Sequence, residues 1–320
     1  MRFGFGCVNL GSASSGRSWA SDVRLVEQAI DLGVRVFDTA DVYGSGSSER
    51  ILGRATRGLR DELVIATKAG YTFRPRTRAE QSARRLAKAV LGRIRRAKRD
   101  ARGGLAGGGA YAEQDFSAAN LRRAVEDSLR RLQTDHVDVL QLHGPHHVEP
   151  RLFDQLQDLV TSGKVLRLGV GAESVDDALA WMAVDGLQVA QLPFGLLDPE
   201  AAERAFPEAA RHSVELWARG VLGGGLFAAA ENDPEAVRTD PKWPLIDGLR
   251  RLAAQSGVDV FRLAIGYVRS FPDVSTLLVG IGTPAHLRRN LDAMAAPPLG
   301  EDVLASIHAL LHEHRGAARG

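Results

Sequence analysis

Four side chains in the first half of the chain are of types that together perform acid–base chemistry. They are Asp38, Tyr43, Lys68 and His143. Free tyrosine has a pKa of about 10 and is a weak acid at neutral pH, but a nearby ammonium stabilises the phenolate and lowers that pKa. Lys68 would do this for Tyr43, Asp38 would hold the ammonium, and His143 would hydrogen-bond a substrate oxygen. This set suits proton transfer to a carbonyl oxygen while hydride reaches the carbonyl carbon.

These residues can act together only if the fold gathers them, and the chain carries a pattern that predicts such a fold. Short apolar runs rich in Val, Ile and Leu recur along it, as is typical of strands buried on both faces of a parallel sheet. The predicted strands are Phe3–Cys7, Val34–Phe37, Leu63–Ala66, Val137–Leu142, Leu166–Val170, Leu187–Leu192, Val214–Trp217 and Thr276–Val279.

Helical patterns lie between these runs. Ser21 is predicted to cap the first helix, which ends at Gly33. Ser117 is predicted to cap the clearest one, whose apolar residues recur at helical spacing as far as Leu132. The other predicted helices are Glu49–Arg57, Pro150–Ser162, Val175–Ala183, Pro199–Ala210, Pro244–Ser256, Val258–Ser270, Pro284–Ala295 and Gly300–Glu313.

Eight strands, each followed by a helix, predict an α/β fold of the (β/α)₈ TIM barrel type, formed by residues 1–320 as a single domain. An open doubly wound sheet with a second domain is the alternative. In a barrel, reactive side chains collect at the carboxyl ends of the strands. Asp38, Lys68 and His143 lie at the ends of the second, third and fourth predicted strands, and Tyr43 follows the second. A barrel would therefore place all four at its mouth.

A basic, Gly-rich insertion at about residues 74–115 interrupts the alternation. The whole chain has 41 Lys and Arg against 39 Asp and Glu, a net charge of +2. Residues 74–102 alone contain twelve basic and two acidic residues, and this local charge of +10 leaves −8 for the remainder. Long loops in compact domains are usually functional or disordered. Two interpretations stay open: the segment, with a basic helix at Arg78–Arg99, attracts an anionic substrate or carrier, or it forms a solvated flap.

Composition excludes several classes of protein. Hydrophobic residues make up 44% and charged residues 25%, which is ordinary for a globular protein. No apolar stretch of about 18 residues predicts a membrane span, and the single cysteine, Cys7, allows no intrachain disulfide. His143, His146 and His147 match no metal-binding spacing, and few aromatic residues accompany the basic insertion. We therefore expect a cytoplasmic protein with no metal, no nucleic-acid partner and no membrane association.

Three segments resemble the aldo-keto reductase superfamily. They are FDTADVYGSGSSERILG from residue 37, VIATK from residue 64 and VDVLQLHGP from residue 137, and the similarity runs in order over nearly the whole chain outside the insertion. The resemblance implies a (β/α)₈ barrel and NAD(P)H-dependent reduction of an aldehyde or ketone, or the reverse oxidation. It places Asp38, Tyr43, Lys68 and His143 on the family's catalytic tetrad, with Tyr43 as the general acid.

The resemblance also implies a cofactor site, which this chain matches in part. Where the family usually has Ser and Asn to hold the nicotinamide carboxamide, this chain has Gly171 and Ala172, and where a nicotinamide-stacking aromatic is usual it has an arginine. The segment VGIGTPAHLRRNL from residue 279 resembles the pyrophosphate and adenosine segment, and its turn before a helix suits an anion. The predicted cofactor-binding residues are Gln191, Arg219, Gly280, Gly282, Thr283, His286, Arg289 and Asn290.

The expected cofactor is NADP, with NAD as the alternative, and the expected partner is a small carbonyl substrate, anionic in one interpretation of the insertion. Arg288 or Arg289 would reach a 2′-phosphate. Two other functions stay open at this point. Lys68 would form a Schiff base in a lyase or isomerase on the same barrel, or the chain would be a cofactor-binding regulatory protein. The sequence predicts neither the substrate's identity nor the oligomeric state.

Overall fold

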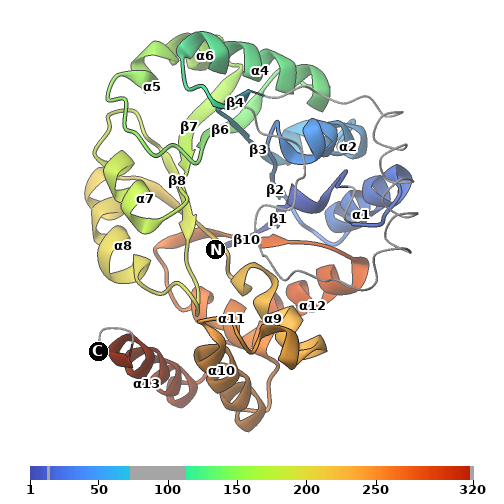
Figure 1. Cartoon of the computed structure of the whole chain (residues 1–320). Helices are drawn as coiled ribbons and strands as arrows, with labels where there is room; N and C mark the ends of the chain where they lie inside the picture. Colours follow the sequence, from blue (N-terminus) through green and yellow to red (C-terminus); the bar gives the residue numbers. More distant parts are fainter. Residues whose placement is uncertain (13–14, 73–112, 318–320) are drawn as a thin grey trace.

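Eight parallel strands close into a barrel in the part of the chain described by a computed structural model, residues 1–12, 15–72 and 113–317. Figure 1 shows the strands at the centre and the helices around them. The order around the barrel is β1, β2, β3, β6, β7, β8, β9 and β10, and β10 pairs again with β1. The strands are β1 Arg2–Gly6, β2 Val36–Asp38, β3 Val64–Ala69, β6 Val137–His143, β7 Val165–Gly171, β8 Val189–Pro193, β9 Glu215–Arg219 and β10 Val274–Gly280.

The barrel confirms the fold predicted from the sequence. Each of the eight predicted apolar runs overlaps one barrel strand. The doubly wound alternative is wrong, because β1 is hydrogen-bonded to β2 on one side and to β10 on the other, so the sheet has no open edge. The predicted basic helix Arg78–Arg99 lies outside the described residues.

The helices follow the predicted alternation, with differences at their ends. They are α1 Trp19–Asp31, α2 Ser47–Ala55, α4 Ala118–Leu132, α5 Leu152–Gln155, α6 Gln157–Thr161, α7 Val175–Met182, α8 Ala201–His212, α9 Leu226–Asn232, α10 Trp243–Gln255, α11 Val260–Arg269, α12 Pro284–Ala295 and α13 Glu301–Ala317. The cap predicted at Ser117 is confirmed. The cap predicted at Ser21 is wrong, because Ser18 caps α1 and its hydroxyl accepts a hydrogen bond from the Ser21 backbone N–H.

Helix α9 and the two short strands β4 and β5 were not predicted. Helix α9 follows a run of three glycines, and a two-stranded antiparallel ribbon, β4 Tyr71–Thr72 and β5 Glu113–Gln114, joins the two ends of the insertion. None of the helices in the described residues combines the length and the apolar character needed to span a membrane.

A layer of apolar side chains fills the barrel below its mouth. Because successive side chains of a strand point to opposite faces, the residue two positions further along each strand also points inward, one layer nearer the carboxyl end. This places Asp38, Lys68, Gln141, Gln191 and Arg219 directly above the apolar layer. The layer is formed by Val36, Ala66, Val139, Val189, Trp217 and Leu278.

A buried ion pair joins α2 to α4 beside the third barrel strand. Arg131 Nε donates to Glu49 Oε2 at 2.5 Å, and the side chains are 7% and 0% exposed. The hydroxyl of Thr67, on β3, donates to the other oxygen of Glu49 at 2.6 Å. Gly53 lets the two helices approach, because a Cβ there would lie 2.1 Å from the Leu132 carbonyl oxygen. The pair therefore fixes both helices against the strand that carries Lys68.

The replacement Arg131→Met should lower the free energy of unfolding by about 3–5 kcal/mol, because it leaves a fully buried carboxylate without its cation. Urea unfolding followed by circular dichroism measures this loss. The matched control is Arg130→Met, which removes an exposed pair with Asp127 and should cost less than about 1 kcal/mol. Equal losses in the two variants would show that the buried pair is not what holds α2 to α4.

Candidate active site

An ion pair between β2 and β3 forms the floor of the barrel mouth. Lys68 Nζ donates to the two carboxylate oxygens of Asp38 at 2.6 and 2.5 Å and to the Thr39 carbonyl oxygen at 3.3 Å. Gln191 and Gln141 each donate an amide hydrogen to Asp38 Oδ1, at 2.9 and 3.3 Å. Both charged side chains are almost fully buried, at 3% exposure for Lys68 and 8% for Asp38. Buried charges persist where they are paired and hydrogen-bonded, as these are.

A tight turn after β2 brings Tyr43 over this pair. Tyr43 begins a short 3₁₀ turn, and the next three residues, Gly44, Ser45 and Gly46, have φ angles of +58°, +55° and +84°. Glycine adopts this left-handed conformation without strain, so the two glycines allow the reversal. The Tyr43 ring lies with its centroid 5.5 Å from Lys68 Nζ and meets the His143 ring edge-on at 5.7 Å between centroids. The fold thus brings all four predicted catalytic residues together.

His143 is held as a neutral imidazole. Burial, followed by the charges of Lys68 and Arg219, lowers the pKa of His143 from 6.5 to about 3. Its Nδ1 atom has no hydrogen-bond partner among the described residues. At neutral pH the ring can therefore donate through one nitrogen and accept through the other, but it carries no charge.

The two-stranded ribbon covers His143, and sequence reasoning missed it. The Tyr71 ring meets the His143 ring edge-on at 5.2 Å between centroids. Gln114 donates from Nε2 to the Tyr71 hydroxyl and to the Gly144 carbonyl oxygen, each at 2.9 Å, and so fastens the ribbon to the end of β6. Because Tyr71 lies three residues after Lys68, its closeness to the predicted catalytic residues could have been expected from the sequence. Gln114 lies at the far end of the insertion, and nothing in the sequence indicates that it contacts the site.

Gln141 was also missed, although strand periodicity points to it. It lies two residues before His143 on β6 and therefore on the same inward face. Gln191, which was predicted to bind the cofactor carboxamide, is 2% exposed, and its Nε2 is bonded to Asp38. The structure thus gives both glutamines one shared contact, and the carboxamide role of Gln191 stays a prediction.

The predicted phosphate-binding residues lie together where β10 ends and α12 begins. Thr283 caps α12, and its hydroxyl accepts from the His286 N–H at 3.1 Å. Gly280 has open space where a side chain would be, because the nearest atom to an added Cβ is 3.9 Å away. The first backbone N–H groups of a helix attract anions, and an exposed glycine turn lets an anion come close. The turn therefore fits a phosphate group, and Asn290, 2% exposed, lies further along the same helix.

Arg17 bonds to this turn, and the sequence did not predict this contact. Its Nη1 donates to the Gly282 carbonyl oxygen, and its Nε donates to Asp22 Oδ1 at 2.5 Å. Asp22 also accepts from the Gly11 N–H at 2.9 Å. The loop after β1 is therefore tied to the turn after β10. The sequence offers no signal for this contact, because Arg17 and Gly282 are far apart in the chain.

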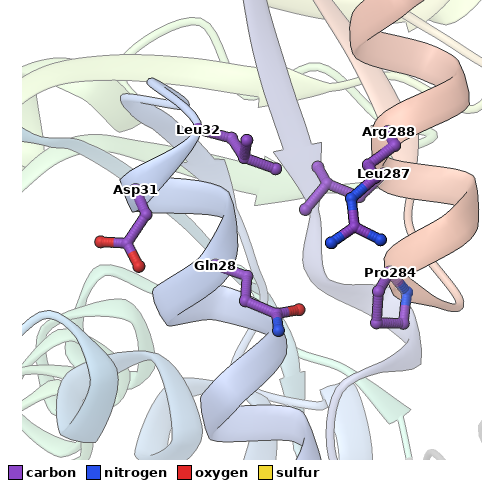
Figure 2. A pocket seen from close by; sticks show the side chains of 6 residues that line it. All are labelled: Gln28, Asp31, Leu32, Pro284, Leu287 and Arg288. Carbon is purple, nitrogen blue, oxygen red and sulfur yellow. The ribbon is translucent and has the colours of Figure 1, made fainter.

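Two arginines of α12 differ in their surroundings. Arg289 binds both oxygens of Glu231 at 2.8 Å and Asp259 Oδ2 at 3.2 Å, and its guanidinium lies 3.8 Å from the centre of the Phe261 ring. Its charge is therefore compensated within the protein. Arg288 lines a separate pocket of about 180 Å³ between α1 and α12, and Figure 2 shows its guanidinium directed into that pocket.

Gly171, the last residue of β7, has little room for a side chain. A Cβ on Gly171 would lie 3.2 Å from Lys68 Cε and 3.3 Å from Gln141 Oε1, which is tighter than ordinary packing. Arg219, predicted to stack on nicotinamide, donates instead to backbone at this strand end, from Nη2 to the Ala172 oxygen at 2.7 Å and to the Glu173 oxygen at 3.0 Å. Its stacking role stays a prediction.

The depressed pKa of His143 makes folding acid-sensitive. The unfolded chain binds a proton at His143 below about pH 6.5, whereas the folded protein binds it only near pH 3. The free energy of unfolding should therefore fall as the pH drops from 6.5 toward about 3. His143→Gln should flatten this fall. Urea unfolding at about pH 7 and about pH 4.5 compares the slopes. The control His147→Gln changes an exposed histidine four residues away and should keep the wild-type slope. A wild-type slope in His143→Gln would contradict the assignment.

Comparison with known proteins places the chain in a family. The profile of the Aldo/keto reductase family matches residues 2–312. The D-threo-aldose 1-dehydrogenase of Pseudomonas sp is 30% identical over 91% of this chain and 88% of its own length. The glycerol dehydrogenase AKR11B4 of Gluconobacter oxydans superposes with a TM-score of 0.74 at 25% identity, covering 98% of this chain and 92% of that chain.

A second solved structure, an aldo/keto reductase from Klebsiella pneumoniae in complex with NADP and acetate, superposes with a TM-score of 0.68 at 24% identity, covering 97% of this chain and 90% of that chain. The profile match, the relatives and the closed barrel agree with the resemblance of the three motifs. This chain belongs to the aldo/keto reductase family.

Proposed function

We propose that this oxidoreductase, folded as one domain, uses NADPH to reduce a small aldehyde or ketone, with Tyr43 as the proton donor. The observation that carries the proposal is the cluster at the barrel mouth, in which Tyr43 lies beside His143 and over the buried pair of Lys68 and Asp38. A nicotinamide cofactor supplies hydride when it is bound. The chain's own residues must bind the carbonyl, orient it and deliver the proton.

Proton delivery falls to Tyr43. Reduction of a carbonyl places negative charge on its oxygen, and a hydroxyl within hydrogen-bonding reach can neutralise that charge by proton transfer. Lys68, 5.5 Å from the centre of the Tyr43 ring, favours the phenolate that this transfer leaves behind. Asp38 holds the ammonium in place through two hydrogen bonds. The proton thus moves from Tyr43 to the substrate oxygen, and Lys68 and Asp38 make that transfer favourable.

His143 orients the carbonyl. Because burial keeps the imidazole neutral, it can donate one hydrogen bond to the substrate oxygen without competing with Tyr43 as an acid. The Tyr71 ring also meets the imidazole edge-on, at 5.2 Å between ring centroids. The carbonyl oxygen would lie within reach of both the Tyr43 hydroxyl and His143, whose rings are in contact.

The cofactor assignment rests on the turn after β10. Gly280, Gly282 and Thr283 would hold the phosphates through backbone N–H groups, with His286 and Asn290 further along α12. NADP is favoured over NAD because a structural neighbour was solved with NADP. Arg289 is held by Glu231 and Asp259, so a 2′-phosphate near it would have to compete with two carboxylates. Arg288 lies in the pocket between α1 and α12.

The Schiff-base alternative is disfavoured by the surroundings of Lys68. An ammonium has three hydrogens, and Lys68 Nζ contacts three acceptors, which are the two Asp38 oxygens and the Thr39 carbonyl oxygen. A nucleophilic lysine would need to lose a proton and approach the substrate, and both changes would break these bonds. A purely regulatory role is disfavoured because binding alone does not require the complete acid–base cluster.

Removing the Tyr43 hydroxyl should stop turnover and spare cofactor binding. Tyr43→Phe should lower kcat by about 10²–10⁴-fold with aldehyde substrates, because general acid catalysis contributes that much. NADPH oxidation measures kcat, and quenching of protein fluorescence measures the Kd of NADPH. The control Tyr267→Phe makes the same chemical change in the core of α11 and should keep turnover. Full activity in Tyr43→Phe would refute the role of the hydroxyl as proton donor.

A further inference from the structure

The ribbon formed by β4 and β5 is closed at its base, next to the end of β3. Gly70 stands between β3 and β4 with a φ of +134°, which suits glycine, and a Cβ there would lie 2.1 Å from Phe116 Cε1. The Gly70 carbonyl oxygen accepts from the Asp115 N–H at 2.8 Å. Tyr71 and Gln114, the next residues along the two strands, pair in register.

Gln114 fastens this ribbon to the end of β6. Its Nε2 donates to the Gly144 carbonyl oxygen and to the Tyr71 hydroxyl, each at 2.9 Å, and makes a longer contact with the His143 carbonyl oxygen at 3.4 Å. An amide nitrogen has two hydrogens, so the two short bonds use both. One side chain therefore connects the Tyr71 hydroxyl to the backbone that directly follows His143.

The Tyr71 ring covers His143. The two rings meet edge-on at 5.2 Å between centroids, and the Tyr43 ring meets the imidazole edge-on at 5.7 Å. Only 7% of His143 is exposed. Of the causes that lower the pKa of His143, burial is the largest, ahead of the charges of Lys68 and Arg219. The protonation state of the imidazole therefore depends first on the groups that keep water away from it.

Titratable and charged side chains surround the imidazole from four elements of the fold. They are Tyr43 after β2, Lys68 on β3 with its partner Asp38, Tyr71 on β4 and Arg219 on β9. A protonated imidazole would place a further cation beside Lys68 and a second acid beside Tyr43. A neutral imidazole can donate a hydrogen bond to the substrate oxygen without supplying the proton.

We propose that Gln114 and Tyr71 are positioning residues that shield His143 from water and so keep it neutral, which leaves proton donation to Tyr43. This proposal rests on the proposed reductase function. Both residues act through the imidazole, and their role requires no contact with the substrate. Without the bonds of Gln114, water would reach the ring and solvate its protonated form, which burial now disfavours.

NMR titration of the imidazole proton signals tests the proposal on the protein alone, without substrate or cofactor. The signal of His143 is identified as the one that His143→Gln removes. In the wild type this signal should show no titration between about pH 5 and about pH 8, the range in which an ordinary histidine changes charge. Gln114→Leu and Tyr71→Ala should each raise the pKa of His143 from about 3 toward 6.5.

Glu113→Leu is the matched control for Gln114→Leu. It places the same side chain at the neighbouring position of β5, whose side chain points to the opposite face of the ribbon, and should leave the titration of His143 unchanged. An equal rise of the pKa in Glu113→Leu would show that any loosening of the ribbon suffices, and would overturn the role of Gln114. A wild-type titration in either Gln114→Leu or Tyr71→Ala would overturn the proposal as well.

A second measurement connects the shielding of His143 to turnover. With NADPH and an aldehyde, kcat/KM of Gln114→Leu should be close to the wild-type value at about pH 8 and depart from it as the pH falls through the raised pKa. A raised pKa with a wild-type pH profile of kcat/KM would overturn the positioning role. If the wild type reduces no aldehyde, the proposed function fails, and the titration still decides whether Gln114 and Tyr71 keep His143 neutral.

Discussion

The buried pair of Asp38 and Lys68 is the interaction on which the rest of the site depends. Moving two charges out of water costs several kcal/mol for each ion, and attraction between them offsets this cost only when their remaining hydrogen-bonding capacity is also filled. Here the carboxylate accepts from Gln141 and Gln191, and the ammonium donates to the Thr39 carbonyl oxygen. The pair and these partners lie on or just after four strands, β2, β3, β6 and β8, so the pair depends on the closed barrel.

The layers above and below this pair are uncharged, which defines where chemistry can occur. Below it, apolar side chains led by Trp217 fill the barrel and block water from that side. Burial, with a further contribution from the Asp38 charge, raises the pKa of the Cys7 thiol, so Cys7 adds no charge beside the pair. Above it stand the neutral His143 and the hydroxyl of Tyr43. The ion pair therefore exerts its effect on Tyr43, on the side of the barrel from which a substrate can enter.

The sequence predicts those parts of the molecule that follow from local periodicity. Strands buried on both faces must be continuously apolar, so the eight runs are visible, and reactive residues at their ends can be read directly. Contacts that depend on register between strands are not visible in this way, and so the bonds from the two glutamines to Asp38 were missed. The carboxylates that hold Arg289 were missed for a related reason. One of them, Glu231, lies on α9, whose seven residues are too few to show a helical period.

The distribution of arginines divides the barrel mouth electrostatically. On the side of the β10 turn, Arg17 and Arg289 are bound by Asp22, Glu231 and Asp259, so the phosphate site relies on backbone N–H groups rather than on free side-chain charge. On the side of β7, Arg219 donates to the Ala172 and Glu173 carbonyl oxygens, and its nearest carboxylate oxygen, Glu173 Oε2, lies 3.7 Å away. The charges of Lys68 and Arg219 both reach His143 and, after burial, contribute to lowering its pKa. The electrostatic potential near His143 therefore depends on a few nearby side chains and cannot be read from the total charge of the chain.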